Sequence, residues 1–302
     1  MKAVLAFVLC LPLLGAAAQE PTNDLAKAQQ ERLAQIQQEI AQNGYHWTPA
    51  MTPIAQLPLE EFHAMLGLRL PENYEPPRAA PFPIRDDLPE SFDWRDFDGV
   101  TPVKNQDGCG SCWDFAAVGA LESVIKIYSG EELDLSEQQV LSCATPGYGC
   151  DGGWMTWAWE HFRVHGAVTE ECMPYEADDE VPCTEDECEK VAATKTWIDI
   201  PNDIDAIKTA VYDYGPVTTT FHVYDDIAYY GGGCYEHEGD DPTNHAVVIV
   251  GWDDNACDGE GAWLIKNSWV TAGARTAICG LSTAPATLAQ GQCSFTTTRR
   301  QT

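Results

Sequence analysis

One stretch of eight residues, Gln106–Trp113, constrains the fold and the chemistry of this chain more than any other part of its sequence. It reads Gln-Asp-Gly-Cys-Gly-Ser-Cys-Trp. Apolar residues at helical spacing follow it, namely Phe115, Val118, Leu121, Ile125 and Tyr128. Cys112 therefore falls in the first turn of a predicted helix, where the positive end of the helix dipole favours a thiolate. The two glycines allow a tight turn into the helix, and Ser111 is expected at its N-cap.

Cys109 and Cys112 also form a Cys-x-x-Cys pair, which redox enzymes and zinc sites use as well. A redox pair is typical of a thioredoxin-like βαβ context, and a zinc site needs a second pair of ligands. The sequence supplies neither pattern. Instead, His245 opens an apolar segment and Asn267 lies in the segment Leu-Ile-Lys-Asn-Ser-Trp, 133 and 155 residues after Cys112. These separations are close to the roughly 130–150 residues that follow a nucleophilic cysteine of the papain type.

Together, these three segments resemble the active-site segments of papain and the cathepsins, whose signature is Cys-Gly-Ser/Ala-Cys-Trp/Tyr. The resemblance implies a cysteine-type endopeptidase in which Cys112 is the nucleophile, His245 is the base and Asn267 orients the imidazole. It also implies that Gln106 donates its side-chain amide to an oxyanion hole, where one donor contributes about 10²–10³ in rate. Such chemistry acts on peptides or proteins and needs no metal or cofactor.

The resemblance assigns further roles around the cleft. Cys109 is expected to form a disulfide with Cys150. Gly152 and Gly153 resemble the backbone on which an extended substrate makes strand-like hydrogen bonds, and a simple glycine turn is the alternative. The tryptophans expected at the site are Trp154, which borders the cleft, and Trp113 and Trp269, which shield it.

The implied fold is α+β, a papain-like fold with a helical left lobe, an antiparallel β right lobe and the active-site cleft between them. About residues 100–195 are expected to form the helical lobe. Ser136–Cys143 has a capping-box pattern, and a second helix follows through residues 154–162. The aromatic residues of that second helix are expected to pack in the core, and a ligand platform is the alternative.

Residues 196–302 are expected to form the β lobe, because β-branched and apolar runs predominate there. Residues 215–223 and 246–252 predict strands, and the second of these directly follows His245. A short helix is expected at residues 205–211, and a turn at residues 229–235.

The amino terminus has the features of a secretory signal. Residues 1–18 combine an early lysine, a short apolar run and small residues, and cleavage is expected after Ala18. The apolar run is too short to span a membrane. The protein is therefore expected to enter the secretory pathway, with an extracellular or a lysosomal or vacuolar destination, where disulfides are permitted.

Residues 19–87 differ from the rest of the chain. They contain a Gln-rich amphipathic helical pattern that begins near Asn23, a short helix that ends at Gly67, and a proline-rich linker. The resemblance implies that this segment is an inhibitory propeptide that lies through the cleft and is later removed. Residues 88–302 would then be the catalytic domain. A permanent N-terminal interaction domain is the alternative.

The cysteine count allows several disulfide patterns. Of 12 cysteines, Cys10 falls in the signal and Cys112 is the nucleophile, so the remaining ten allow five bridges. Two groups have open connectivity: Cys143, Cys172, Cys183 and Cys188 in the helical lobe, and Cys234, Cys257, Cys279 and Cys293 in the β lobe.

The formal net charge of −30 disfavours nucleic acid and anionic membranes as partners. The chain is expected to be a monomer whose partners are its substrates and its own propeptide. A solvated acidic surface explains the charge, and adaptation to an acidic compartment or a salty medium is the alternative. The acidic stretch 170–189 lacks a calcium-loop pattern with a central glycine, which favours a solvated loop. Six histidines lack motif support and are predicted to be surface or packing residues: His46, His63, His161, His165, His222 and His237.

Three departures from the family pattern keep a second hypothesis open. Asp107 and Asp114 stand where the family commonly has glycine and alanine, and like-charge repulsion from Asp114 is expected to raise the pKa of Cys112. The segment after Trp269 is about a strand and a turn shorter than in the family, through divergence or an incorrect gene model. The first hypothesis is an active peptidase made as a zymogen. The alternative is a catalytically impaired papain-fold protein that binds peptides or partners.

Overall fold

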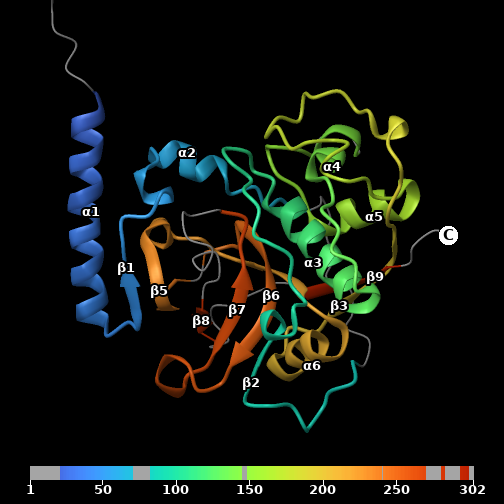
Figure 1. Ribbon diagram of the computed structural model, residues 1–302. Helices are drawn as coiled ribbons and strands as arrows, with labels where there is room; N and C mark the ends of the chain where they lie inside the picture. The colour runs from blue at the N-terminus through green and yellow to red at the C-terminus, as the bar shows by residue number, and fades with distance from the viewer. Residues whose placement is uncertain are drawn as a thin grey trace, which may run out of the picture.

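The computed structural model describes residues 21–70, 82–144, 148–239, 241–269, 280–282 and 293–298. A helical lobe lies beside a lobe built on a twisted sheet, and the amino-terminal segment lies along the outer edge of the sheet and across the top of the molecule (Figure 1). The two-lobe α+β architecture expected from the sequence is confirmed.

The helical lobe is organised around α3 (Cys112–Ser129), in which every residue from Cys112 to Ile125 is buried. A helix that is buried on all sides needs apolar residues all round, and Phe115, Val118, Leu121 and Ile125 are part of that burial. The other elements of this lobe are α4 (Glu137–Cys143), α5 (Met155–His165) and the 3₁₀ helix η3 (Glu185–Glu187).

The predicted helix 136–143 is confirmed, with half of the predicted capping box. The Ser136 hydroxyl accepts a hydrogen bond from the Gln139 N–H at 3.0 Å, as an N-cap does. The Gln139 side chain does not turn back to the Ser136 N–H. It donates instead to the Gly166 carbonyl and to the Glu185 carboxylate, and so ties α4 to α5 and η3.

The β lobe is a nine-stranded sheet in the order β1-β5-β8-β7-β6-β4-β9-β3, with β2 also paired to β6. Its strands are β1 (Trp47–Pro49), β2 (Ser91–Asp93), β3 (Thr194–Ile200), β4 (Val217–Phe221), β5 (Tyr230–Tyr235), β6 (His245–Asp253), β7 (Ala262–Lys266), β8 (Gly280–Ser282) and β9 (Cys293–Thr298). All the described pairings are antiparallel except the one between β5 and β8. The helix α6 (Ile204–Tyr214) packs on β3, β4, β6 and β9, and three 3₁₀ helices border this lobe, namely η2 (Trp94–Phe97), η4 (Asp225–Tyr229) and η5 (Cys257–Gly259).

Residues 229–235, predicted to form a turn, are mostly the strand β5, so that prediction was wrong. The three glycines suggested a turn, but tertiary pairing decided otherwise, because β5 pairs with β1 of the amino-terminal segment and with β8. Gly233 has a φ of 92°, and a Cβ at this position would lie 2.5 Å from the His46 carbonyl oxygen. The glycine therefore allows β1 to approach β5 closely.

The amino-terminal segment consists of α1 (Pro21–Asn43), β1, the 3₁₀ helix η1 (Ile54–Gln56) and α2 (Leu59–Ala64). It contributes buried side chains to the core of the β lobe, among them Ile36, Trp47 and Phe62. Trp47 packs against Tyr235 with ring centroids 5.3 Å apart. The segment therefore shares a hydrophobic core with the sheet.

Four disulfides join the cysteines whose side chains the structure describes: Cys109–Cys150, Cys143–Cys183, Cys172–Cys188 and Cys234–Cys257. Cys112 is the free cysteine among them. These bridges resolve the connectivity left open in the helical lobe. The pairing of Cys279 and Cys293, the secretory signal, and the segment that directly follows Trp269 lie outside the described residues and side chains.

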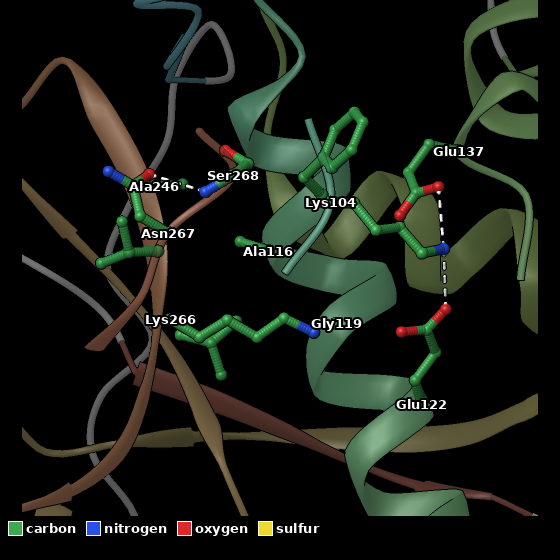
Figure 2. A pocket seen from close by; sticks show the side chains of 12 residues that line it. Lys104, Ala116, Gly119, Glu122, Glu137, Ala246, Lys266, Asn267 and Ser268 are labelled. Carbon is green, nitrogen blue, oxygen red and sulfur yellow. Dashed lines mark hydrogen bonds and ion pairs between the residues drawn. The ribbon is translucent and has the colours of Figure 1, made fainter. Parts of the chain in front are cut away.

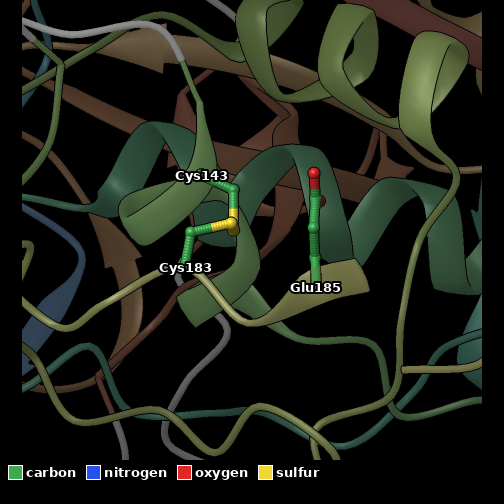
Figure 3. A group of neighbouring side chains, drawn as sticks. All are labelled: Cys143, Cys183 and Glu185. Carbon is green, nitrogen blue, oxygen red and sulfur yellow. A yellow bond between two sulfur atoms is a disulfide. The ribbon is translucent and has the colours of Figure 1, made fainter. Parts of the chain in front are cut away.

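Cys143, Cys183 and Glu185 lie close enough together to resemble a metal site (Figure 3). The two sulfurs are joined in a disulfide, and the Glu185 carboxylate already contacts Gln139 and His161. Metal ligands are thiolates rather than disulfide sulfurs, so this group does not fit a metal ion. Within the described ranges, every helix is too short or too polar to cross a membrane.

Candidate active site

Cys112 is the first residue of α3 and is completely buried. Ser111 lies at the N-cap position, but its hydroxyl does not cap the helix. It contacts the Tyr175 hydroxyl at 2.7 Å. Burial raises the pKa of the Cys112 thiol to about 11, against the opposing effect of backbone N–H groups of Ala246 and Gly67. The thiol therefore lies between α3, the strand β6 and the amino-terminal segment.

His245 opens β6 directly before Ala246, whose backbone N–H contacts the Cys112 sulfur. Its Nε2 is hydrogen-bonded to the Asn267 Oδ1 at 2.8 Å. The ring of Trp269 stacks on the imidazole with centroids 4.6 Å apart. Burial lowers the pKa of His245 to about 4, and its Nδ1 has no hydrogen-bond partner among the described residues. In this state, both the thiol and the imidazole are neutral near pH 7.

Gln106 directs its side-chain amide into the same space. Its Nε2 donates to the Cys109 carbonyl and to the Met65 carbonyl, each at 2.8 Å, and the second acceptor belongs to the amino-terminal segment. The orientation is held from the other lobe, because the Gln106 Oε1 accepts a hydrogen bond from the Ser268 hydroxyl at 2.5 Å. The Gln106 amide thus already donates to a main-chain carbonyl of the amino-terminal segment, that of Met65.

The amino-terminal segment continues past the thiol along Gly153. The Gly153 N–H donates to the Gly67 carbonyl at 2.9 Å, and the Arg69 N–H donates to the Gly153 carbonyl at 2.9 Å. A Cβ on Gly67 would lie 1.6 Å from the Gly110 carbonyl oxygen, so only glycine fits where the two backbones cross. A Cβ on Gly152 would come within 2.6 Å of the Gly67 carbonyl oxygen. Gly152 and Gly153 thus lie against the backbone of the amino-terminal segment, which is held at Gly153 in a strand-like arrangement.

Trp113 and Trp154 are both buried in the core of the helical lobe. The Trp113 ring lies beneath the glycines, where a Cβ on Gly153 would meet it at 2.3 Å. Trp154 is the N-cap residue of α5 and is 2% exposed. In the described structure Trp113 therefore supports the glycine backbone from below, and Trp269 is the ring that covers the imidazole.

Comparison with known proteins agrees with this geometry. The model of the papain family cysteine protease domain matches residues 88–293. The chain belongs to this family. It is 36% identical to mouse cathepsin K over 232 residues, which is 73% of this chain and 68% of that protein.

Two solved papain-family structures cover different shares of the chain. The digestive procathepsin L2 of Tenebrio molitor is 28% identical and superposes with a TM-score of 0.80 over 91% of this chain and 92% of its own. The bromelain protease of Ananas comosus, in complex with the E64 inhibitor, is 32% identical, with a TM-score of 0.64 over 70% of this chain and 99% of its own. The chain is a papain-family cysteine-type peptidase.

A buried ionic cluster that the sequence motifs did not reveal lies against α3, the helix that begins with Cys112. Lys104 forms ion pairs with Glu122 at 2.8 Å, with Asp134 at 2.7 Å and with Glu137 at 3.1 Å. Figure 2 shows Lys104 between Glu122 and Glu137 on one side of α3. These three residues are among those that line a small cavity of about 10 Å³. One sequence feature could have indicated the cluster, because Lys104 is a basic residue only two positions before Gln106.

A second lysine of this cluster comes from β7 and lies directly before Asn267. The Lys266 ammonium donates to the Thr101 hydroxyl, which donates in turn to Glu122, both at 2.7 Å. Burial lowers the pKa of Lys266. Burial also raises the pKa of Glu137 to about 8, although Lys104 opposes this shift. The cluster thus links α3, which carries the thiol, to the strand that leads into Asn267.

Asp114 differs from the other acids near α3. It is completely buried, and neither of its carboxyl oxygens has a hydrogen-bond partner within the described part of the chain. Burial raises the pKa of Asp114 well above its ordinary value, which favours the neutral carboxyl. A neutral carboxyl exerts no like-charge repulsion, and burial is the first cause of the raised pKa of Cys112.

Proposed function

We propose that this chain is the zymogen of an endopeptidase that cleaves peptide bonds with Cys112. The thiolate attacks the substrate carbonyl, and the Gln106 amide and the Cys112 N–H stabilise the oxyanion. The His245 imidazolium protonates the leaving amine, and water then hydrolyses the thioester while Asn267 keeps the ring oriented. The observation that carries this proposal is the hydrogen bond from the Gln106 Nε2 to the main-chain carbonyl of Met65.

The amino-terminal segment is proposed to be the inhibitory propeptide, with bounds 19–87 and the catalytic domain at 88–302. It makes the hydrogen bonds of a bound peptide at Gly153, and it excludes water from Cys112 and His245. The match to a procathepsin over a larger share of the chain than to bromelain supports this division. A signal at residues 1–18, a monomeric state, and an extracellular or a lysosomal or vacuolar destination belong to the same proposal.

Removal of the propeptide is proposed to switch the protonation state of the site. With the cleft covered, burial favours a neutral thiol and a neutral imidazole. Water in an open cleft solvates charge, and the thiol pKa in papain is about 3–4. The thiolate–imidazolium pair therefore forms when the segment leaves, which links cleavage of the propeptide to activity.

The alternative, a catalytically impaired papain-fold protein that binds peptides or partners, is motivated by the short segment after Trp269. Against it, the Trp269 ring already stacks on His245 without that segment. In addition, β8 pairs with β7, so this edge of the sheet is covered. These observations favour the enzyme.

The deciding experiment titrates acid-activated protein with a thiol-directed peptide epoxide and follows hydrolysis of a fluorogenic peptide. We expect one equivalent of label on Cys112, loss of the amino-terminal segment by mass, and turnover that the epoxide abolishes. Cys112→Ser is the control and should neither label nor hydrolyse the peptide. Folded wild-type protein that loses the segment but neither labels nor turns over would support the binding protein.

A further inference from the structure

A cavity of about 490 Å³ lies between the amino-terminal segment and the β lobe. The amino-terminal segment contributes His63, Leu66 and Arg32 to its walls. The β lobe contributes His222, Tyr224, Asp225, Asp226, His237 and Asn244. When the amino-terminal segment leaves, this wall of the β lobe faces the open cleft.

The cavity lies on the leaving-group side of the nucleophile. Gly67 contacts the thiol, and residues that follow it in the chain pair with Gly153, where the acyl part of a substrate is proposed to lie. His63 and Leu66 precede Gly67 and lie in the cavity. Because His245 protonates the leaving amine, the part of a substrate after the scissile bond extends toward this cavity.

The two neighbouring carboxylates in the cavity differ in which part of the chain supplies their partners. Asp226 is 4% exposed, and its carboxylate accepts hydrogen bonds from the Tyr235 hydroxyl at 2.5 Å and from His237 at 2.8 Å, both within the β lobe. Asp225 is exposed, and its described ion pair is with His63 of the amino-terminal segment, at 2.7 Å. Departure of the segment therefore leaves Asp225 without its basic partner.

Three aromatic rings line the same cavity as Asp225. The Tyr224 ring stacks on His237 with centroids 3.7 Å apart, and the His222 ring is tilted by 52° with its centroid 4.3 Å from that of Tyr224. Planar guanidinium groups stack on such rings while they pair with a carboxylate, and lysine stems pack on them. The amino-terminal segment already places basic side chains here, since Arg32 lines the same cavity as His63.

We propose that the mature enzyme binds a basic side chain of its substrate, arginine or lysine, on the leaving-group side, with Asp225 as the residue that determines this specificity. The inference rests on the proposed function and names the substrate class of the same site. His63 holds, in the zymogen, the place that the substrate's basic group takes in the mature enzyme. Asp225 acts on substrate choice and not on the chemical step.

The test measures kcat/KM of the enzyme obtained by acid activation of the full-length protein. The substrates are internally quenched peptides that share the same residues before the scissile bond. Each of the first three positions after the scissile bond carries arginine, lysine, leucine or glutamate in turn. We expect a threefold to tenfold preference, on the order of an exposed or partly desolvated charge pair, for the basic residues over leucine at one position. Glutamate should be the poorest substrate there.

Substitutions at Asp225 test whether the charge of this side chain, and not a general change in activity, determines the preference. D225N should remove the preference, so that kcat/KM for the arginine and lysine peptides falls to the value for the leucine peptide of the same variant. D225E should retain the preference, and D225K should invert it toward glutamate. Asp186, an exposed acid in η3 of the helical lobe, supplies the control D186N, which should behave as the wild type.

Two results would overturn the inference alone. The first is equal kcat/KM for arginine, leucine and glutamate at all three positions in protein that labels fully at Cys112. The second is a basic preference that persists in D225N. Folded protein that neither labels nor cleaves any peptide overturns the proposed function, and this inference with it.

Discussion

The two lobes hold the proposed catalytic groups by different physical means. On the helical side, α3 packs against a buried ionic cluster, in which Lys104 pairs with Glu122 and Glu137. On the β side, His245 lies between rings, with Phe221 at 5.8 Å and Trp269 at 4.6 Å between centroids. A buried charged network is costly to break, and its stability changes with pH. Packing between rings costs less to disrupt and depends less on pH. The packing that holds Cys112 should therefore weaken or strengthen with pH. The packing that holds the His245 ring should change much less.

The largest expected effect is on the helical side. Lys104→Met leaves Glu122 and Glu137 buried without their cation, and we expect it to lower the free energy of unfolding by about 3–5 kcal/mol. Urea denaturation of the zymogen at pH 7 measures this. Lys195→Met, at an exposed position of β3, is the matched control and should change stability by less than about 0.5 kcal/mol. A loss under about 1 kcal/mol for Lys104→Met would show that the charged network is not the main support of α3.

The next effect tests the residue that joins the two lobes. Gln106→Ala should lower kcat of the activated enzyme by about 10²–10³ with little change in KM, because it removes one oxyanion donor. Epoxide titration counts the intact sites, so a folding defect is not mistaken for a chemical one. Ser268→Ala removes only the hydrogen bond that orients Gln106 from the β side and should cost less. If kcat of Gln106→Ala fell less than tenfold, the oxyanion role would be wrong.

Asp114 provides a test of how stability on the helical side depends on pH. Burial raises its pKa in the folded state above the unfolded value of about 3.9. The folded protein therefore holds this proton more tightly, so the contribution of Asp114 to stability is most favourable below about pH 4 and is lost as pH rises toward the folded pKa. Asp114→Asn should reduce that fall and stabilise the zymogen at pH 7 by about 1–3 kcal/mol. Glu137, whose pKa is also raised, should keep part of the slope.

Denaturation at pH 4 and pH 7 measures the difference between wild-type protein and Asp114→Asn. Asp186→Asn serves as the control, because Asp186 is exposed in η3. Identical slopes of stability against pH for the wild type and Asp114→Asn would contradict a buried carboxyl beside the nucleophile.

The smallest expected effect lies on the outer edge of the β side. A hydrogen bond to Glu236 raises the pKa of His46, which precedes β1. The pair therefore helps to hold β1 on β5 below about pH 6.5, and this contribution is lost as pH rises through the raised pKa. In the Cys112→Ser zymogen, amide exchange of residues 47–49 should be slower at pH 5.5 than at pH 8, after correction for intrinsic rates.

His46→Gln should remove that difference, which we expect to be at most about threefold. His165→Gln in the helical lobe is the control and should leave the exchange of β1 unchanged. A difference of the same size in His46→Gln would mean that other groups set the pH response of this edge.

Local patterns in the sequence predicted much of the fold. The apolar spacing after Trp113 predicted α3, and the β-branched run at 215–223 predicted β4. The failures arose where distant segments meet. The glycines of β5 indicate a turn when taken alone, and they form a strand because β1 lies against them. The ionic cluster on α3 was missed because its members come from separate parts of the chain.

By itself, the sequence determined the family, the two lobes and the order of Gln106, Cys112, His245 and Asn267, because these depend on motifs with a fixed local structure. Only the tertiary structure decided the protonation state of the site and the surroundings of Asp225. Both depend on which segments lie over the cleft. Burial by a segment more than forty residues away in sequence keeps the thiol and the imidazole neutral. A pKa is a property of the folded surroundings, and residue identity alone does not supply it.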